Sequence, residues 1–403
     1  MSTESAQVPG PLPERAVLVH IGPYKTGTTA IQSSLHQHRA ELAAAGVTYP
    51  GGYHRQMRPS WALLGRSRVG EDDVPMSEWD DLVAEVRRAP GRVVISSEDF
   101  SSARPEHVQR LVDDLGRDLV HVLVVARRLD RLLPSAWQER VKSVNETRTY
   151  DAWLREVLSE KRGGAAARVF WHNHGLDGLV RRWRAVLPPE QVVVLVTDED
   201  DRGRQQRTFE RLLGLPEGLL TPGRHSNTSL SMERIEFCRQ VNLAVEAHGW
   251  VGDKRLNPAR RSLLAGLRSA PLADWETLIP PLPRWTLDRL TRLSDARAEA
   301  VAGADATVLG DPDLLRWHGA GVGDDLGDPP DTMPTAAAAG AMEQALAGSL
   351  KAFRRQRRPR ASSPAPSSAP SPASTSAPPV TGVPGRELVR ELGRRVRRRL
   401  RRR

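Results

Sequence analysis

Four short apolar runs constrain the fold of this chain more than any other feature. They are rich in branched side chains and read AVLVHI (16–21), RVVISS (92–97), HVLVVA (121–126) and QVVVLV (191–196). Helical patterns fill most of the stretches between them. Strands that are apolar on both faces and alternate with helices are typical of a parallel sheet covered on both sides. The sequence therefore predicts an α/β fold in which helices sandwich a parallel sheet.

The composition divides the chain into four ranges. Residues 1–15 are polar and contain prolines, so we expect disorder there, whereas 16–325 carry the alternating pattern and form the predicted folded domain. Within that domain, 230–300 reads as mostly helical. The range 326–385 is rich in Ala, Pro and Ser and predicts a linker that forms no core. The range 386–403 is Arg-rich and could form a basic amphipathic helix.

The net charge of +10 comes from the C-terminal end of the chain. Residues 351–360 carry +6 and residues 386–403 carry +8, so residues 1–350 carry −4, the difference between +10 and +14. The folded domain is thus mildly acidic, which argues against a specific nucleic-acid-binding body. The Arg-rich tail has two interpretations: a solvated basic end, or an anchor for anionic lipid, RNA or another polyanion.

Cysteine usage and hydropathy indicate the compartment. The single cysteine, Cys238, excludes an internal disulfide and favours a reducing cytosol. The first twenty residues lack the apolar run of a signal peptide, and no apolar stretch approaches the length of a membrane span. We therefore expect a cytoplasmic protein, with peripheral membrane association through the tail as an open alternative.

The segment after the first apolar run, GPYKTGTT (22–29), is almost a nucleotide-binding loop. Gly22 and Gly27 have the spacing of the P-loop pattern G-x-x-x-x-G-K-[ST], but Thr28 stands where the lysine belongs. The only lysine, Lys25, lies inside the loop. A loop between a strand and a helix offers backbone N–H groups to an anion, and glycines let the ligand approach closely. The pattern predicts an anion site whose ligand is shorter than a triphosphate.

This loop resembles the 5′-phosphosulfate-binding loop P-K-[ST]-G-T-T of sulfotransferases that use 3′-phosphoadenosine 5′-phosphosulfate (PAPS). Tyr24 is inserted between the proline and the lysine. Family members also carry an arginine after the third main strand and a serine eight residues later, and Arg127 and Ser135 stand at these positions. The resemblance implies that both hold the 3′-phosphate, which a guanidinium grips through paired hydrogen bonds. Arg128 is a rival for the arginine role.

The resemblance also implies roles for the loop. Lys25 is the expected catalytic cation, which stabilises the bridging oxygen of the leaving phosphate. The residues expected to bind PAPS are Lys25, Thr26, Gly27, Thr28, Thr29, Arg127 and Ser135. A sulfuryl group carries less charge than a γ-phosphate, so we expect no metal. His172 and His174 have a spacing that metal ligands use, but two histidines alone are more often ordinary polar residues.

A general base must deprotonate the acceptor, and members of the family use histidine or glutamate. Glu98 follows the second apolar run and falls at the carboxyl edge of the predicted sheet, so it is the expected base. Alternatively, Glu98 or Asp99 only charges the first turn of a helix that starts near Ser101. His54 is a rival base. Its loop also contains four side chains that could contact a sugar or another polar acceptor: Tyr53, Arg55, Arg58 and Trp61.

A weaker similarity lies at 224–242, where an Asn-x-Ser-Leu-Ser segment resembles one in bacterial sulfotransferase-like proteins. Arg224, Asn227 and Ser229 are candidates for closing over the nucleotide. An ordinary helix start, with Ser229 or Ser231 as the N-cap, explains the same residues.

Together these features predict a PAPS-dependent sulfotransferase that acts on a hydroxyl or amine, with a carbohydrate or small metabolite as the expected acceptor. One alternative is a P-loop kinase that uses ATP on a small molecule. Another is a degenerate, non-enzymatic member that binds polyanions through its tail.

Overall fold

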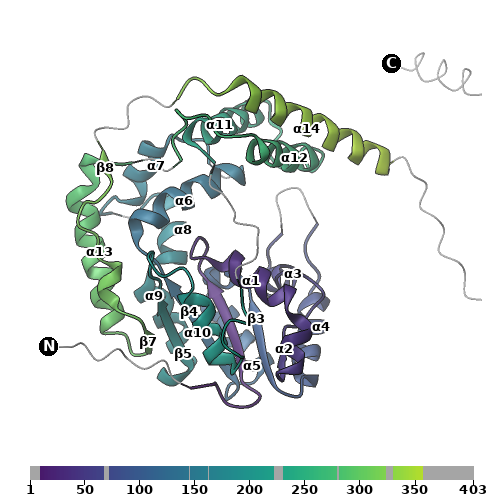
Figure 1. Ribbon diagram of the computed structural model, residues 1–403, viewed down its shortest axis with the longest axis vertical. Helices are drawn as coiled ribbons and strands as arrows, with labels where there is room; N and C mark the ends of the chain where they lie inside the picture. Colours follow the sequence, from purple (N-terminus) through teal and green to yellow (C-terminus); the bar gives the residue numbers. More distant parts are fainter. Residues whose placement is uncertain are drawn as a thin grey trace, which may run out of the picture. The chain divides into compact units, whose positions relative to one another are not determined.

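The computed structural model describes residues 10–67, 72–144, 146–161, 163–221, 230–278, 281–323 and 330–356. Their core is a six-stranded sheet in which every neighbouring pair is parallel (Figure 1). The strand order is β2 (Val47–Thr48), β3 (Arg92–Ser96), β1 (Val17–Gly22), β4 (Val120–Ala126), β5 (Val192–Val196) and β7 (Thr307–Leu309). The predicted α/β fold is confirmed, and all four predicted strands are present.

Successive side chains of each strand face opposite layers of helices. On β1, Val19 packs in a cluster that includes Trp79 and Trp183, whereas Leu18 packs with Ile31 and Phe209. The first layer contains α3 (Met57–Leu64), α4 (Ser77–Arg88), α5 (Pro105–Leu115), α9 (Leu176–Arg184) and α13 (Leu287–Ala302). The second contains α1 (Thr28–Gln37), α2 (Arg39–Ala44) and α10 (Arg204–Leu213). Because both faces are covered, the strands are mostly apolar.

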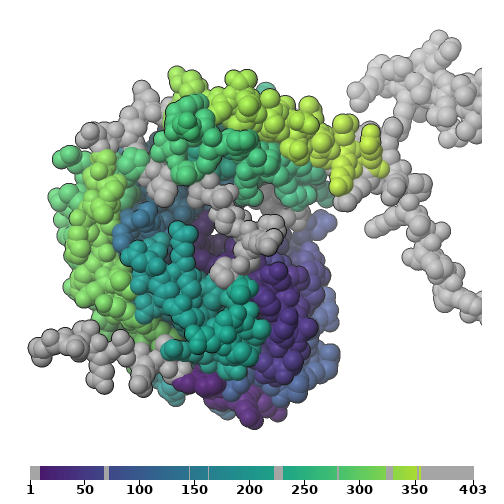
Figure 2. Space-filling model, in the orientation of Figure 1, coloured from purple at the N-terminus to yellow at the C-terminus, as the bar shows by residue number. Residues whose placement is uncertain are grey.

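A third cluster is built mostly from helices, with Leu282 and Trp317 added from outside them. It joins α6 (Leu129–Lys142), α7 (Tyr150–Val157), α8 (Ala165–His174), α11 (Met232–Ala247), α12 (Leu256–Ser269) and α14 (Thr335–Gln356). The remaining short elements are η1 (Glu98–Ser102), η2 (Pro189–Gln191), η3 (Arg284–Thr286), η4 (Pro312–Leu315) and the two-stranded pair β6 (Leu282–Pro283) and β8 (Val322–Gly323). The space-filling view shows a hollow between the helices of this third cluster and the α1 region (Figure 2).

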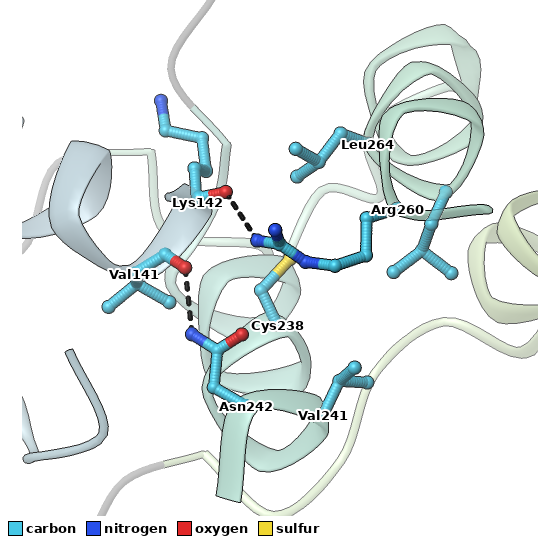
Figure 3. A pocket seen from close by; sticks show the side chains of 8 residues that line it. Val141, Lys142, Cys238, Val241, Asn242, Arg260 and Leu264 are labelled. Atoms are coloured by element: carbon cyan, nitrogen blue, oxygen red, sulfur yellow. Dashed lines mark hydrogen bonds between the residues drawn. The ribbon is translucent and has the colours of Figure 1, made fainter. Parts of the chain in front are cut away.

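The end of α6 is fastened to the helical cluster through its last carbonyl groups (Figure 3). Asn242 of α11 donates to the Val141 carbonyl at 2.7 Å, and Arg260 of α12 donates to the Lys142 carbonyl at 2.8 Å. The last carbonyls of a helix lack partners within it, so donors from neighbouring helices satisfy them. Cys238 lies between them, and burial raises the pKa of its thiol to about 12.

Several sequence expectations need correction. A helix interior usually disfavours proline, but Pro134 lies inside α6, which runs through it and forgoes only one backbone hydrogen bond. Disorder was wrong for residues 10–15, since Leu12 is buried and its N–H donates to the Leu212 carbonyl at 2.9 Å. The linker prediction does not hold for 335–356, which form α14. Residues 357–385 of the predicted linker and the predicted basic helix at 386–403 lie outside the described residues.

The helix α14 packs against α12 through small residues. A β-carbon on Gly266 would lie 2.7 Å from the Ala341 Cα, so this close approach needs glycine. Ala-rich sequence was interpreted as linker composition, but here the small side chains allow two helix backbones to meet. In the described part of the chain, no helix combines the length and the apolar character that crossing a bilayer requires.

Candidate active site

The predicted anion loop joins the carboxyl end of β1 to the start of α1. Strand β1 lies between β3 and β4, so the strands that follow it in the chain are added to the sheet on both of its sides. Open α/β sheets bind ligands at such a switch point. The Thr26 hydroxyl donates to the Pro23 carbonyl at 2.7 Å and closes the turn. Thr28 and Thr29 open α1, where first-turn N–H groups lack helical partners.

Two residues of the loop have unusual backbone conformations. Lys25 has φ 70°, which non-glycine residues rarely adopt, and Gly27 has φ 91°. This φ at Gly27 would strain any other residue, and a β-carbon there would also displace the end of the Gln205 side chain, whose Oε1 atom would lie 2.6 Å away. Left-handed non-glycine residues occur where the surrounding structure holds them and are frequent at ligand sites.

The Lys25 side chain reaches α6. Its Nζ atom lies 2.7 Å from Glu139 Oε2, and Lys142 lies 3.5 Å from the same oxygen. Burial acts to raise the pKa of Glu139, but the charges of Lys25 and Lys142 oppose it and lower that pKa to about 2. Glu139 is therefore ionised at neutral pH and holds the ammonium group of the loop lysine.

Arg127 brings the second motif to the loop. It follows β4, and its Nη1 atom donates to the Lys25 carbonyl at 2.9 Å. Its Nε and Nη2 atoms bind the two carboxylate oxygens of Glu199 at 2.7 and 2.9 Å. The rival, Arg128, instead forms a fork with Asp130 at 2.9 and 2.7 Å. The guanidinium in contact with the loop is thus that of Arg127.

Ser135 is half-buried on α6, four residues before Glu139. Residues four apart share a helix face, so Ser135 lies on the face that Glu139 turns toward Lys25. The loop and the arginine after β4 therefore meet at one edge of the sheet, and the serine of α6 lies on the helix face that Glu139 turns toward Lys25. Their roles toward a nucleotide remain a prediction.

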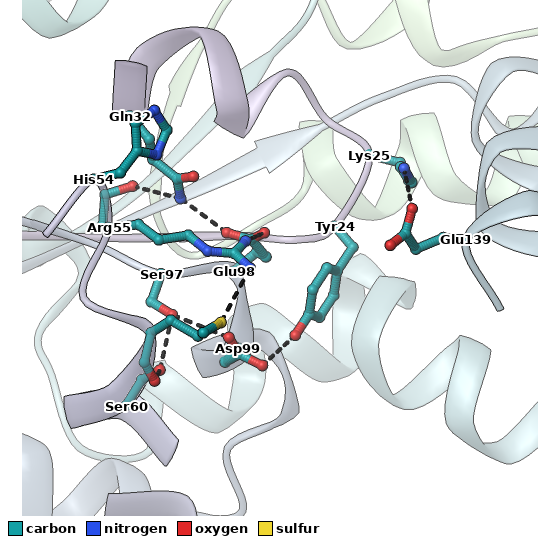
Figure 4. A network of polar contacts seen from close by, with 12 residues as sticks. Tyr24, Lys25, Gln32, His54, Arg55, Ser60, Ser97, Glu98, Asp99 and Glu139 are labelled. Carbon is teal, nitrogen blue, oxygen red and sulfur yellow. Dashed lines mark hydrogen bonds and ion pairs between the residues drawn. The ribbon is translucent and has the colours of Figure 1, made fainter. Parts of the chain in front are cut away.

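Glu98 lies directly beside the loop (Figure 4). A β-carbon on Gly22 would lie 3.0 Å from the Glu98 Cβ atom, so glycine permits this approach. Gln32 donates to Glu98 Oε2 at 2.8 Å, and Arg55 pairs with Oε1. Both sequence interpretations describe part of this geometry, because Glu98 stands at the carboxyl edge of the sheet and also begins the short helix η1.

Asp99 and Tyr24 form a second link between the loop and η1. The Tyr24 hydroxyl donates to Asp99 Oδ1, and Arg66 lies 3.3 Å from the same oxygen. Burial and the negative charge of Asp99 raise the pKa of Tyr24 well above its usual value. The tyrosine inserted into the family pattern therefore ties the loop to η1. No role in the site was predicted for Asp99.

The rival base, His54, is exposed, and its Nε2 atom lies 2.7 Å from the Ser33 hydroxyl. Partial burial of the imidazole, together with the charges of His36 and Arg55, lowers the pKa of His54. Its neighbour Tyr53 is also exposed, and Arg58 pairs with Glu78 at 2.7 Å.

A pocket of about 670 Å³ opens beside Lys25. Residues of the sheet edge form one wall, among them Tyr24, Arg55, Trp61 and Asp99. Residues from the end of α6, from α8 and from the segment 245–268 form the other walls. Of the acceptor candidates, Arg55 and Trp61 line this pocket.

The other candidates have ordinary surroundings or fall outside the description. His172 contacts the Ser102 carbonyl, His174 is buried, and the described residues contain no group of three or more His, Cys, Asp or Glu side chains suited to a metal. Ser231 is the N-cap of α11 and accepts from the Arg234 N–H at 3.3 Å, so the helix-start interpretation is confirmed for it. Arg224, Asn227 and Ser229 lie outside the described residues.

Sequence reasoning missed the carboxylates that hold the cations. Glu199 lies in the acidic run after β5. Its position could have placed it near Arg127, because the carboxyl ends of the neighbouring parallel strands β4 and β5 meet at one edge of the sheet. Glu139 follows Ser135 by one helical turn, which placed it on the site face once Ser135 was a candidate. No feature of the sequence indicates that Gln32 of α1 contacts Glu98.

Comparison with solved structures adds a likeness in fold. A solved sulfotransferase from Alicyclobacillus acidocaldarius is similar to this chain with a TM-score of 0.37 and 19% identity, over 56% of this chain and 92% of that one. No family model and no curated protein matches the sequence. The functional interpretation therefore depends on the residues of the site.

Proposed function

We propose that this protein transfers a sulfuryl group from PAPS to a hydroxyl or amine of an acceptor. One observation carries the proposal: the guanidinium of Arg127 donates to the carbonyl of Lys25 at 2.9 Å, across 102 positions of sequence. The two motifs on which the resemblance depends, one for each phosphate end of PAPS, are therefore in direct contact.

The chemistry of the loop suits an anion of this kind. Lys25 and Arg127 are about one quarter exposed, so both cations are accessible to a ligand while their carboxylate partners hold them in place. A phosphate offers more negative charge and more acceptor oxygens than a carboxylate, so it competes well for a guanidinium fork. We infer that the phosphosulfate replaces Glu139 at Lys25 and that the 3′-phosphate replaces Glu199 at Arg127.

The proposed reaction is an in-line displacement at sulfur. The acceptor oxygen forms a bond to sulfur while the bond from sulfur to the 5′-phosphate oxygen breaks, and that oxygen keeps the electron pair. The Lys25 ammonium group stabilises the charge that develops there. Glu98 takes the acceptor proton. Each Glu98 oxygen accepts one hydrogen bond, from Arg55 or Gln32, and each keeps a lone pair.

Nucleotide binding tests the proposal before any acceptor is known. Calorimetric titration should show binding of adenosine 3′,5′-bisphosphate, the product nucleotide, and no magnesium-dependent binding of ATP. The opposite pattern would contradict the proposal and favour the kinase alternative. Incubation with sulfur-labelled PAPS and candidate acceptors, followed by mass spectrometry, then identifies the product, with Lys25→Ala as the inactive control.

A further inference from the structure

The pocket beside Lys25 carries a strong excess of positive charge. Eight of its lining side chains are cationic and three are carboxylates, a difference of five. The cations are Lys25, Arg55, Arg66, Arg140, Lys142, Arg260, Arg261 and Arg268. The folded range as a whole is mildly acidic, so this excess is local to the pocket.

The three carboxylates are already engaged. Glu139 pairs with Lys25 and Lys142, and Asp99 accepts from Tyr24 and pairs with Arg66. Asp253 pairs with Arg255, which is not part of the pocket wall. Little free negative charge therefore remains for the cations at the far end of the pocket.

That far end is formed by α12 and the last turn of α6. Within the described ranges, Arg260, Arg261 and Arg268 have no carboxylate partner at ion-pair distance, although Arg260 donates to the Lys142 carbonyl. The carbonyl ends of α6 account for Arg260, because cations are favourable at a helix C-terminus. Arg261 and Arg268 are both exposed, and the α6 carbonyls do not explain their position.

Lys142 lies between the two ends of the pocket. Its side chain is 8% exposed. Burial, together with repulsion from Lys25 and Arg268, lowers its pKa to about 8, although Glu139 opposes this. Cations gathered in this way repel one another in the free protein, and a bound anion would relieve that repulsion.

The pocket also offers apolar surface next to the charges. Val169, Trp250 and Val251 line it and are each about half exposed, and Trp61 lines the opposite wall. A volume of about 670 Å³ is within the range of pockets that enclose a small organic molecule. Apolar walls beside a group of cations suit a ring or sugar body that carries an anionic group.

We infer that the acceptor is itself an anion, with a carboxylate, sulfate or phosphate group bound by Lys142, Arg261 and Arg268. The inference rests on the proposed function, which makes this pocket the acceptor site. The acceptor hydroxyl then lies at the sheet edge near Lys25 and Glu98, and the anionic group lies toward α12. Neither the phosphate loop nor Arg127 takes part in this recognition.

A matched pair of fluorescent probes tests the inference. Methoxypyrene trisulfonate carries three anionic groups and no acceptor hydroxyl, and methoxypyrene is its neutral counterpart. Anisotropy titrations of the full chain, with and without adenosine 3′,5′-bisphosphate, should show at least tenfold tighter binding of the trisulfonate. The double variant Arg261→Ala/Arg268→Ala should lose about tenfold of that affinity. Arg181→Ala removes an exposed arginine outside the pocket wall and should change nothing.

Three outcomes overturn the inference: absent trisulfonate binding, equal binding of both probes, or unchanged binding by a double variant whose melting curve matches the wild type. Failure of the proposed function is separate, because it appears as lost nucleotide binding while the trisulfonate still binds. Competition with inorganic phosphate, sulfate and acetate then distinguishes which anionic group the pocket prefers.

Discussion

Ion pairs at the loop differ in kind from the ion pair that fastens α11 to the segment after α12. Arg234 and Glu276 have side chains that are 2% and 0% exposed. The five N–H donors of Arg234 go to both Glu276 oxygens and to the carbonyls of Leu267, Ala270 and Pro271. Arg127 has one donor on the loop and two on Glu199, and both partners are more than 20% exposed.

This contrast distinguishes an ion pair that stabilises the fold from one whose cation is available to a ligand. A guanidinium that is fully satisfied and buried can exchange no partner without leaving charge unpaired. A cation paired at a ligand-accessible edge can exchange its carboxylate for a more highly charged anion. The structure places Arg234 in the first class, and we propose that Lys25 and Arg127 belong to the second.

The largest expected effect is on stability, at Arg234. Arg234→Ala leaves the buried Glu276 carboxylate unpaired and should lower the free energy of unfolding by about 3–5 kcal/mol. Urea denaturation measures the loss. Arg110→Ala removes an exposed pair with Asp114 and should cost at most about 0.5 kcal/mol. A loss below about 1 kcal/mol for Arg234→Ala would contradict its structural role.

Lys25→Ala should affect turnover and leave stability unchanged. Removing the cation that faces the developing charge should lower kcat by about 10²–10³-fold. Sulfuryl transfer from labelled PAPS provides the rate, and a thermal melt confirms the fold. Lys161→Ala, at an exposed position, is the control. Wild-type turnover in Lys25→Ala would remove this lysine from the mechanism.

The roles of the two neighbouring carboxylates of η1, Glu98 and Asp99, can be distinguished by replacing each with its uncharged amide. Glu98→Gln should lower kcat by about 10²-fold, because a base that accepts the acceptor proton is lost. Nucleotide affinity should hardly change. Asp99→Asn keeps the Tyr24 contact and should have a smaller effect on kcat. If Asp99→Asn has the larger effect, the base is the aspartate that lines the pocket.

Arg127 and its partner should change nucleotide affinity in opposite directions. Arg127→Ala should weaken binding of adenosine 3′,5′-bisphosphate by about 2 kcal/mol, or roughly 30-fold. Glu199→Gln removes the competing carboxylate and should strengthen binding a few-fold. Calorimetric titration gives both values. An effect confined to Arg128→Ala would transfer the role to Arg128, and weaker binding by Glu199→Gln would contradict partner exchange.

The smallest effect concerns pH at the anionic end of the pocket. Lys142 has a pKa of about 8, so it loses its positive charge as the pH rises through this value. Lys25, Glu139 and Arg268 face it. Trisulfonate binding should therefore weaken about two- to threefold between pH 7 and pH 9. Lys142→Arg keeps the charge and should flatten this profile, and an equal profile in both proteins would contradict the assignment.

Long apolar runs made the sheet predictable, but the shortest elements left no signal. The strands β2 and β7 have two and three residues, too few to show a pattern, and the sequence missed both. The helix α14 was missed because Ala-rich composition resembles a linker until a neighbouring helix is known. Periodicity therefore predicted the core, and tertiary contacts decided the rest.

The candidate site was predictable where a motif names the residue. Glycine spacing led to the loop with Lys25, and an arginine after a strand led to Arg127. The partners that hold them were not predictable, because Glu139 and Glu199 acquire meaning only when the chain brings α6 and the end of β5 to the loop. Tyr24 interrupts the family pattern, and its contact with Asp99 was not predictable from one chain.

A crystal structure with adenosine 3′,5′-bisphosphate would show whether the nucleotide replaces the carboxylates at Lys25 and Arg127. We expect the 5′-phosphate at Lys25 and the 3′-phosphate at Arg127 and Ser135, with the Lys25–Glu139 and Arg127–Glu199 pairs broken. A nucleotide bound elsewhere, or one bound while both pairs persist, would contradict this expectation.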